Sequence, residues 1–103
     1  MKREELVKIF LKEKKRLGIR EKIDLEVANI KHLGLANISK KKIKISKHLV
    51  ETNYKEGIRW VIRHELLHIK YKTPYHTMEF FPPERVTETL EKKLAKNSLY
   101  LDM

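Results

Sequence analysis

The sequence predicts an α+β fold: an N-terminal helix, a small three-stranded and mostly antiparallel sheet, a buried central helix, and a C-terminal helix with a tail. The main observation is a change in the spacing of apolar residues, from a helical period of 3.6 to a strand period of 2 over residues 19–50 and back again. A length of 103 residues allows one modest hydrophobic core, so we expect residues 1–103 to form a single domain.

The composition excludes several classes of protein. The chain has no cysteine, which rules out disulfides, thiolate metal sites and a thiol nucleophile. No apolar run approaches the ~20 residues needed to cross a bilayer, and the N-terminus does not resemble a signal peptide, so we expect a soluble, cytoplasmic protein with no membrane partner. Abundant Lys and Glu without Gln or Cys are typical of a thermophilic source.

Residues 3–17 are predicted to form the first helix. Leu6, Phe10 and Leu17 gather on one side of it at helical spacing, while basic residues occupy much of the remaining surface. Gly18 is well placed to end the helix, because glycine is common just after a helix C-terminus. This helix is expected to serve packing and to carry no chemistry.

Three short strands are predicted after this helix, near residues 23–27, 35–38 and 42–46. In the first and the third of them apolar residues alternate with polar ones, and the third has the pattern of a strand with one face in contact with water. The connections between them are too short for crossover helices, so we expect mostly antiparallel pairing.

The strand region also carries basic residues and two histidines, His32 and His48. Both histidines lie in or beside predicted turns and are interpreted as surface residues. The formal net charge of +10 is compatible with nucleic acid as a partner, but the basic residues are spread over the chain, so a solvated surface is the favoured interpretation. Lysine also keeps edge strands from pairing with other chains, which is the favoured role of Lys40, Lys41, Lys42, Lys44 and Lys47.

Residues 55–71 are predicted to form the second helix, buried on two sides. One apolar face carries Ile58, Ile62 and Leu66, a second apolar face lies opposite, and only a narrow strip is polar. A helix of this kind is expected between two layers, here the sheet and another helix. Prolines then mark a short turn over 75–81, and a last helix follows over 84–97.

The second helix carries the pattern HELLH at residues 64–68. Histidines four residues apart project from one face of a helix, so His64 and His68 can bind a single metal ion. Glu65 lies between them and can take a proton from a metal-bound water. Zinc is favoured by the ligand type. The alternative is a helix with two histidines that bind no metal, but the mid-helix position and the apolar flanks favour the metal site.

A catalytic zinc site needs a third protein ligand. His76 lies eight residues after His68, beyond a proline-marked turn that could return its imidazole to the first two. Glu84 and Glu88 lie on the following helix and would give a thermolysin-like arrangement. Spacing alone leaves this choice open.

These features resemble the zincin metallopeptidases, and in particular the minigluzincins, minimal soluble proteases of about this length from thermophilic prokaryotes. The resemblance covers most of the chain, is specific at His64, Glu65 and His68, and implies a minimal zincin-like domain with one zinc ion per chain. It also implies a histidine as third ligand in place of the gluzincin glutamate, and the only downstream histidine is His76. SprT-type proteases, which also use a third histidine after a comparable gap, are a more distant resemblance.

The resemblance implies a zinc metalloendopeptidase that hydrolyses peptide bonds through a zinc-bound water, with Glu65 as general base and then general acid. It further implies a latent form in which a C-terminal segment covers the cleft, within one chain or across a homodimer. The apolar residues 98–103 fit such an inhibitory tail. The alternatives are a SprT-type DNA-associated protease and a non-catalytic module that binds nucleic acid or protein on the same scaffold.

Overall fold

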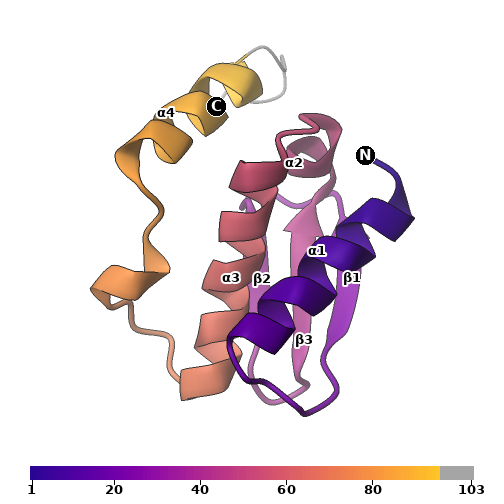
Figure 1. The fold of residues 1–103 in the computed structure, drawn as a ribbon, viewed down its shortest axis with the longest axis vertical. Coiled ribbons are helices and arrows are strands. Elements are labelled where there is room, and N and C mark those ends of the chain that lie inside the picture. Colours follow the sequence, from indigo (N-terminus) through magenta and orange to yellow (C-terminus); the bar gives the residue numbers. More distant parts are fainter. Residues whose placement is uncertain (96–103) are drawn as a thin grey trace.

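The computed structural model describes residues 1–95 of the chain and confirms the predicted α+β class (Figure 1). The predicted end of the last helix, at residue 97, and the predicted tail 98–103 lie outside the described residues. The elements are, in order, α1 (Arg3–Arg16), β1 (Asp24–Ala28), β2 (Gly34–Asn37), β3 (Lys42–Ser46), α2 (Lys47–Glu51), α3 (Lys55–Tyr71), the short 3-10 helix η1 (Met78–Phe80) and α4 (Glu84–Ala95).

The sheet has the order β1-β3-β2 and is mixed. β2 pairs antiparallel with β3, as predicted, whereas β1 pairs parallel with β3. The difference arises because β3 carries Ile43 and Ile45, both fully buried, and takes the central position between two strands that are consecutive in the sequence. β2 is therefore an edge strand, and its position beside α3 matters for the site described below.

The predicted role of the strand lysines is wrong for Lys42 and Lys44, because β3 is the central strand. Lys42 and Lys44 lie on the central strand and not on an edge, so protection of an edge cannot be their role. Lys42 instead pairs with Glu26 of β1 at 2.5 Å. Lys42 and Lys44 alternate along β3 with the buried isoleucines and keep the opposite face of the sheet in contact with water.

Figure 1 shows α1 and α3 side by side across one face of the sheet, with α4 on the other side of α3. As predicted, α3 is buried on two sides, and Ile58, Ile62, Leu66 and Leu67 are all fully buried. α1 ends near the predicted residue, where Gly18 adopts a left-handed φ of 70°. Among the described residues, no helix combines the length and apolarity that a membrane-spanning segment requires.

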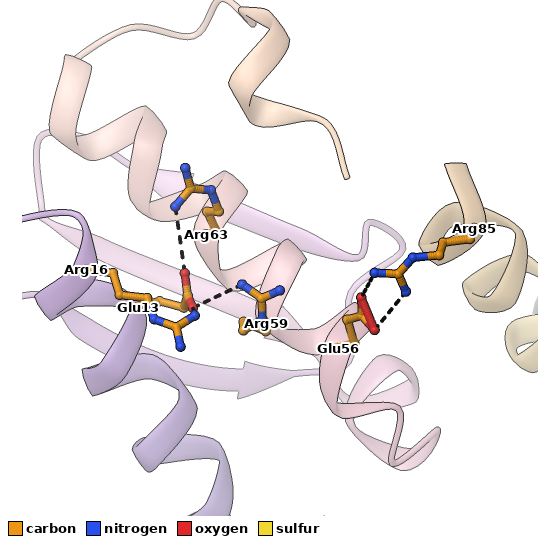
Figure 2. A network of polar contacts seen from close by, with 6 residues as sticks. All are labelled: Glu13, Arg16, Glu56, Arg59, Arg63 and Arg85. Atoms are coloured by element: carbon orange, nitrogen blue, oxygen red, sulfur yellow. Dashed lines mark hydrogen bonds and ion pairs between the residues drawn. The ribbon is translucent and has the colours of Figure 1, made fainter. Parts of the chain in front are cut away.

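A buried carboxylate joins α1 to α3 (Figure 2). Glu13 of α1 is fully buried, and its carboxylate lies 2.9 Å from Arg16 of the same helix. It also reaches Arg59 at 3.3 Å and Arg63 at 3.9 Å on α3. Since a buried carboxylate is tolerated only when it is paired, this cluster defines how the two helices dock.

The sequence did not predict α2. Ser46 accepts hydrogen bonds from the backbone N–H groups of His48 and Leu49, at 3.2 and 3.4 Å, and thereby caps a helix of only five residues. His48 is consequently a half-buried residue of this helix, so its interpretation as a surface histidine is wrong. A helix this short shows too few turns for its apolar spacing to be recognised.

Candidate metal centre

Three histidine side chains converge at the end of α3. His64 and His68 lie one turn apart on this helix with ring centroids 4.9 Å apart. His76, from the loop before η1, has its ring centroid 4.8 Å from that of His64 and 4.9 Å from that of His68. Each of the three offers a nitrogen, and these nitrogens all lie within 4.8 Å of one another.

The loop that carries His76 turns back toward His64 and His68 because α3 ends abruptly. Lys72 adopts a left-handed conformation with φ 52°, and the N–H of Thr73 donates to the carbonyl of His68 at 3.2 Å. Pro74 follows and prevents the helix from continuing. Phe80, which is fully buried, then anchors the returning segment, with its ring 4.8 to 5.4 Å from the three imidazoles.

Backbone carbonyls orient two of the imidazoles. Nδ1 of His64 lies 3.0 Å from the carbonyl oxygen of Phe80, and Nδ1 of His68 lies 2.8 Å from that of Thr73. A carbonyl can only accept a hydrogen bond, so each Nδ1 carries a proton, and in a neutral imidazole this leaves Nε2 as the nitrogen that can bind a metal ion. Burial, together with the neighbouring His68 and His76, lowers the pKa of His64, which favours the neutral form that binds metal.

The donor set fits a zinc ion. Nε2 of His68 and Nε2 of His76 are 3.2 Å apart. Tetrahedral zinc with Zn–N bonds of roughly 2.0–2.1 Å would hold two nitrogens about 3.3–3.4 Å apart. Imidazole is also a ligand type that zinc accepts readily. The pair His68 and His76 therefore already matches a shared zinc ion, and the three nitrogens, which lie within 4.8 Å of one another, would have to move closer together for all of them to bind it.

Glu65 lies beside the histidines and lines the same cavity. Its side chain packs against β2 at Gly34 and the residue is only 7% exposed. This burial removes water from the carboxyl group and raises the pKa of Glu65 to about 7. A carboxyl group of this kind can exchange a proton near neutral pH.

Two cavities meet at Glu65. One, of about 410 Å³, lies between α3 and α4 and is largely apolar, with Trp60, Leu90 and Leu94 in its lining. The other, of about 290 Å³, lies between the edge strand β2 and the three histidines. The residues that border both cavities are His32, Gly34, His64 and Glu65.

The structure brings together His64, His68 and His76, and Glu65 lies next to them. Glu84 and Glu88, the other candidates for a third ligand, are exposed on α4 and do not belong to this group. His32 is exposed, as predicted, although it borders both cavities. Metal binding by the three histidines stays a prediction.

Sequence reasoning missed two residues of the site, Gly34 and Phe80. Gly34 lies just before the predicted strand 35–38, where a glycine is expected in a turn, so the close approach of another group was not indicated; a glycine inside a strand would have been such a signal. Phe80 is an apolar residue between two proline-marked breaks, where an anchor for the loop could have been sought.

The fold is similar to that of two small metallopeptidase zymogens of known structure. It matches the crystal structure of the metallopeptidase zymogen of Pyrococcus abyssi abylysin, with a TM-score of 0.71 and 21% identity over 88% of this chain and 92% of that chain. It also matches the metallopeptidase zymogen of Methanocaldococcus jannaschii jannalysin, with a TM-score of 0.70 and 22% identity over 88% of each chain. The resemblance to the minigluzincins is thereby confirmed at the level of the fold.

A relative with higher sequence identity carries no assigned activity. The uncharacterized protein aq_aa15 of Aquifex aeolicus (strain VF5) is 36% identical over 101 residues, which cover 96% of this chain and 84% of the relative. The chain belongs to the same family as this protein. No model of a protein family matches the sequence.

Proposed function

We propose that the protein is a zinc-dependent metalloendopeptidase. One zinc ion per chain would be held by His64, His68 and His76, with Glu65 as general base and acid. The observation that carries this proposal is the convergence of three imidazole nitrogens within 4.8 Å beside a buried carboxyl group that borders two cavities. The fold shared with two metallopeptidase zymogens supports it.

Three histidine ligands would leave a bound zinc ion with its full positive charge. Three neutral imidazoles add no negative charge, and two of them are oriented by the carbonyls of Phe80 and Thr73. When bound, zinc supplies a Lewis acid that polarises the scissile carbonyl and lowers the pKa of a water molecule.

Glu65 transfers the proton from the attacking water to the leaving group. Its carboxylate accepts a proton from the attacking water and then donates it to the nitrogen of the leaving amine. The raised pKa of about 7 supports this role, because a group that must both accept and donate works best when neither form is strongly favoured. Glu65 lines both cavities, which supports a substrate peptide bond next to its carboxyl group.

The substrate we propose is an extended peptide. β2 is an edge strand and borders the cavity in front of the histidines through Gly34, Leu35 and Ala36. An edge strand offers unpaired backbone groups to which a peptide can add as a further strand. The apolar cavity of about 410 Å³ next to Glu65 would accept an apolar side chain of such a peptide.

We further propose that the C-terminal segment keeps the enzyme latent. Leu90 and Leu94 of α4 line the apolar cavity, so the chain leaves the described region close to the site. The segment that follows contains Leu99, Tyr100 and Leu101, which suit an apolar cavity. The two similar solved structures are both zymogens.

The test is hydrolysis of an unfolded protein such as casein by the zinc-loaded full chain and by a chain truncated after Asn97. We expect the truncated chain to be more active, and Glu65→Gln to abolish hydrolysis in both while zinc stays bound. A folded, zinc-loaded truncated chain without activity would contradict the enzyme proposal. Activity that requires DNA would instead support the SprT-type alternative.

A further inference from the structure

The face of β2 that meets α3 is made of small residues. Gly34 and Ala36 are half-buried on this face, whereas Leu35 and Asn37 are exposed on the other. A Cβ atom at Gly34 would lie 2.9 Å from both Cγ and Oε2 of Glu65, and 3.0 Å from Cγ1 of Val61. Non-bonded carbon atoms pack at roughly 3.5–4.0 Å, so the Glu65 side chain occupies the space that a side chain at this position would need.

The backbone conformation at position 34 does not require a glycine. Gly18 is the only described glycine with a positive φ, so Gly34 has a conformation that other residues can adopt. Glycine within a strand lowers stability, because it loses more conformational freedom on folding and offers no side chain for packing. A reason for glycine here must come from its surroundings, and Glu65 supplies one.

Pairing with β3 keeps β2 from moving away from α3. Gly34 is paired opposite Ile45 of the central strand, and the N–H of Ser46 donates to the carbonyl of Leu33 at 2.9 Å. Val61, the other neighbour, is a buried residue of α3. The Glu65 side chain is the most flexible of the neighbours, so a methyl group at position 34 would displace it first.

We propose that Gly34 is a positioning residue for Glu65: its missing side chain leaves the space in which the Glu65 carboxyl group lies, at the junction of the two cavities. The steric part of this inference stands on the contacts alone. Its consequence for catalysis rests on the proposed peptidase function. In this role Gly34 acts through Glu65.

A double-mutant cycle on the full-length chain tests the steric part. The unfolding equilibrium constant is measured in urea at one fixed zinc concentration, with and without Gly34→Ala, in three backgrounds: Glu65, Glu65→Gln and Glu65→Ala. We expect Gly34→Ala to raise the constant at least tenfold in the first two backgrounds, because Gln keeps the shape of Glu. In the Glu65→Ala background the rise should be threefold or less, since the obstructing side chain is gone. An equal rise of the unfolding equilibrium constant on Gly34→Ala in all three backgrounds would overturn the proposal.

Gly57→Ala is the matched control. A Cβ at Gly57 would lie 2.6 Å from Leu90 and from Tyr54, on a part of α3 that faces α4, so its effect should not depend on the residue at 65. For catalysis, Gly34→Ala in the zinc-loaded chain truncated after Asn97 should lose at least tenfold in kcat with KM changed less than threefold, because a displaced Glu65 impairs proton transfer. Unchanged kcat with raised KM would mean that position 34 only admits substrate and would overturn the positioning role. A folded, zinc-loaded chain truncated after Asn97 that shows no hydrolysis would refute the proposed function, and the cycle would still decide the role of Gly34.

Discussion

His68 and His76 face each other with their Nε2 atoms 3.2 Å apart, although the end of α3 lies between them. The same chain reversal supplies the carbonyl of Thr73, which lies 2.8 Å from Nδ1 of His68. The loop therefore both orients a helical histidine and delivers the third one. A single local feature, the left-handed residue Lys72 followed by Pro74, makes both contacts possible.

We predict that His76→Ala lowers zinc affinity by more than ~100-fold, because loss of a ligand should exceed the roughly 10–100-fold cost of losing an outer-shell partner. Competition with a chromogenic chelator measures this. Glu84→Gln and Glu88→Gln are the controls and should bind zinc like the wild type, since both glutamates are exposed on α4. Tight zinc binding by His76→Ala would contradict the proposed ligand set.

The buried carboxyl group of Glu65 predicts a pH dependence of stability in the metal-free chain. Its pKa is raised from 4.5 to about 7, so the folded chain keeps a proton that the unfolded chain releases. Stability should therefore fall as the pH rises from about 4.5 to about 7, by at most ~3 kcal/mol from this group. Urea denaturation in the presence of a chelator measures the effect against Glu65→Gln, which cannot ionise. Parallel curves for the two chains would show that the prediction is wrong.

Local patterns predicted the long helices well, although they missed the five-residue α2. The bounds of α3 agree with the predicted 55–71, because seventeen residues with a strong apolar period leave little choice of register. The order of the strands depended on which strand became central, and that is decided by long-range packing of Ile43 and Ile45. Spacing can suggest antiparallel neighbours but cannot show that a third strand will separate them.

The site was predictable to different degrees. His64, Glu65 and His68 lie within one pattern, so helix geometry alone relates them. The position of His76 depends on a chain reversal and on an anchor at Phe80, neither of which spacing reveals. Resemblance to a family, and not the residues alone, favoured His76 over the glutamates of the last helix.

Phe80 should be needed for zinc binding without touching the metal. Its fully buried ring lies against all three imidazoles, so Phe80→Ala should cost about 3–5 kcal/mol of stability and loosen the loop that carries His76. We expect zinc affinity to fall at least ~10-fold, as for loss of an outer-shell partner. Phe10→Ala, in the core on α1, is the control and should lower stability while folded protein keeps its zinc affinity. Equal zinc affinities of the two folded variants would refute the anchoring role.

The last prediction concerns the docking of α1 on the helix that carries the histidines. Glu13 is fully buried among Arg16, Arg59 and Arg63, and Arg63 directly precedes His64 (Figure 2). Glu13→Gln would leave these arginines without their negative partner. We expect a loss of about 2–4 kcal/mol, below the upper end for buried pairs because the arginines remain in contact with water.

Glu56→Gln is the control for this loss, since Glu56 pairs with Arg85 in an exposed ion pair shown in the same view. An ion pair in contact with water contributes little to stability, so this variant should unfold at nearly the wild-type urea concentration. Equal stabilities of Glu13→Gln and Glu56→Gln would show that the buried cluster does not hold α1 on α3. A selective loss in Glu13→Gln, with zinc affinity of the folded protein retained, would show that the cluster acts on helix docking and not on the metal site.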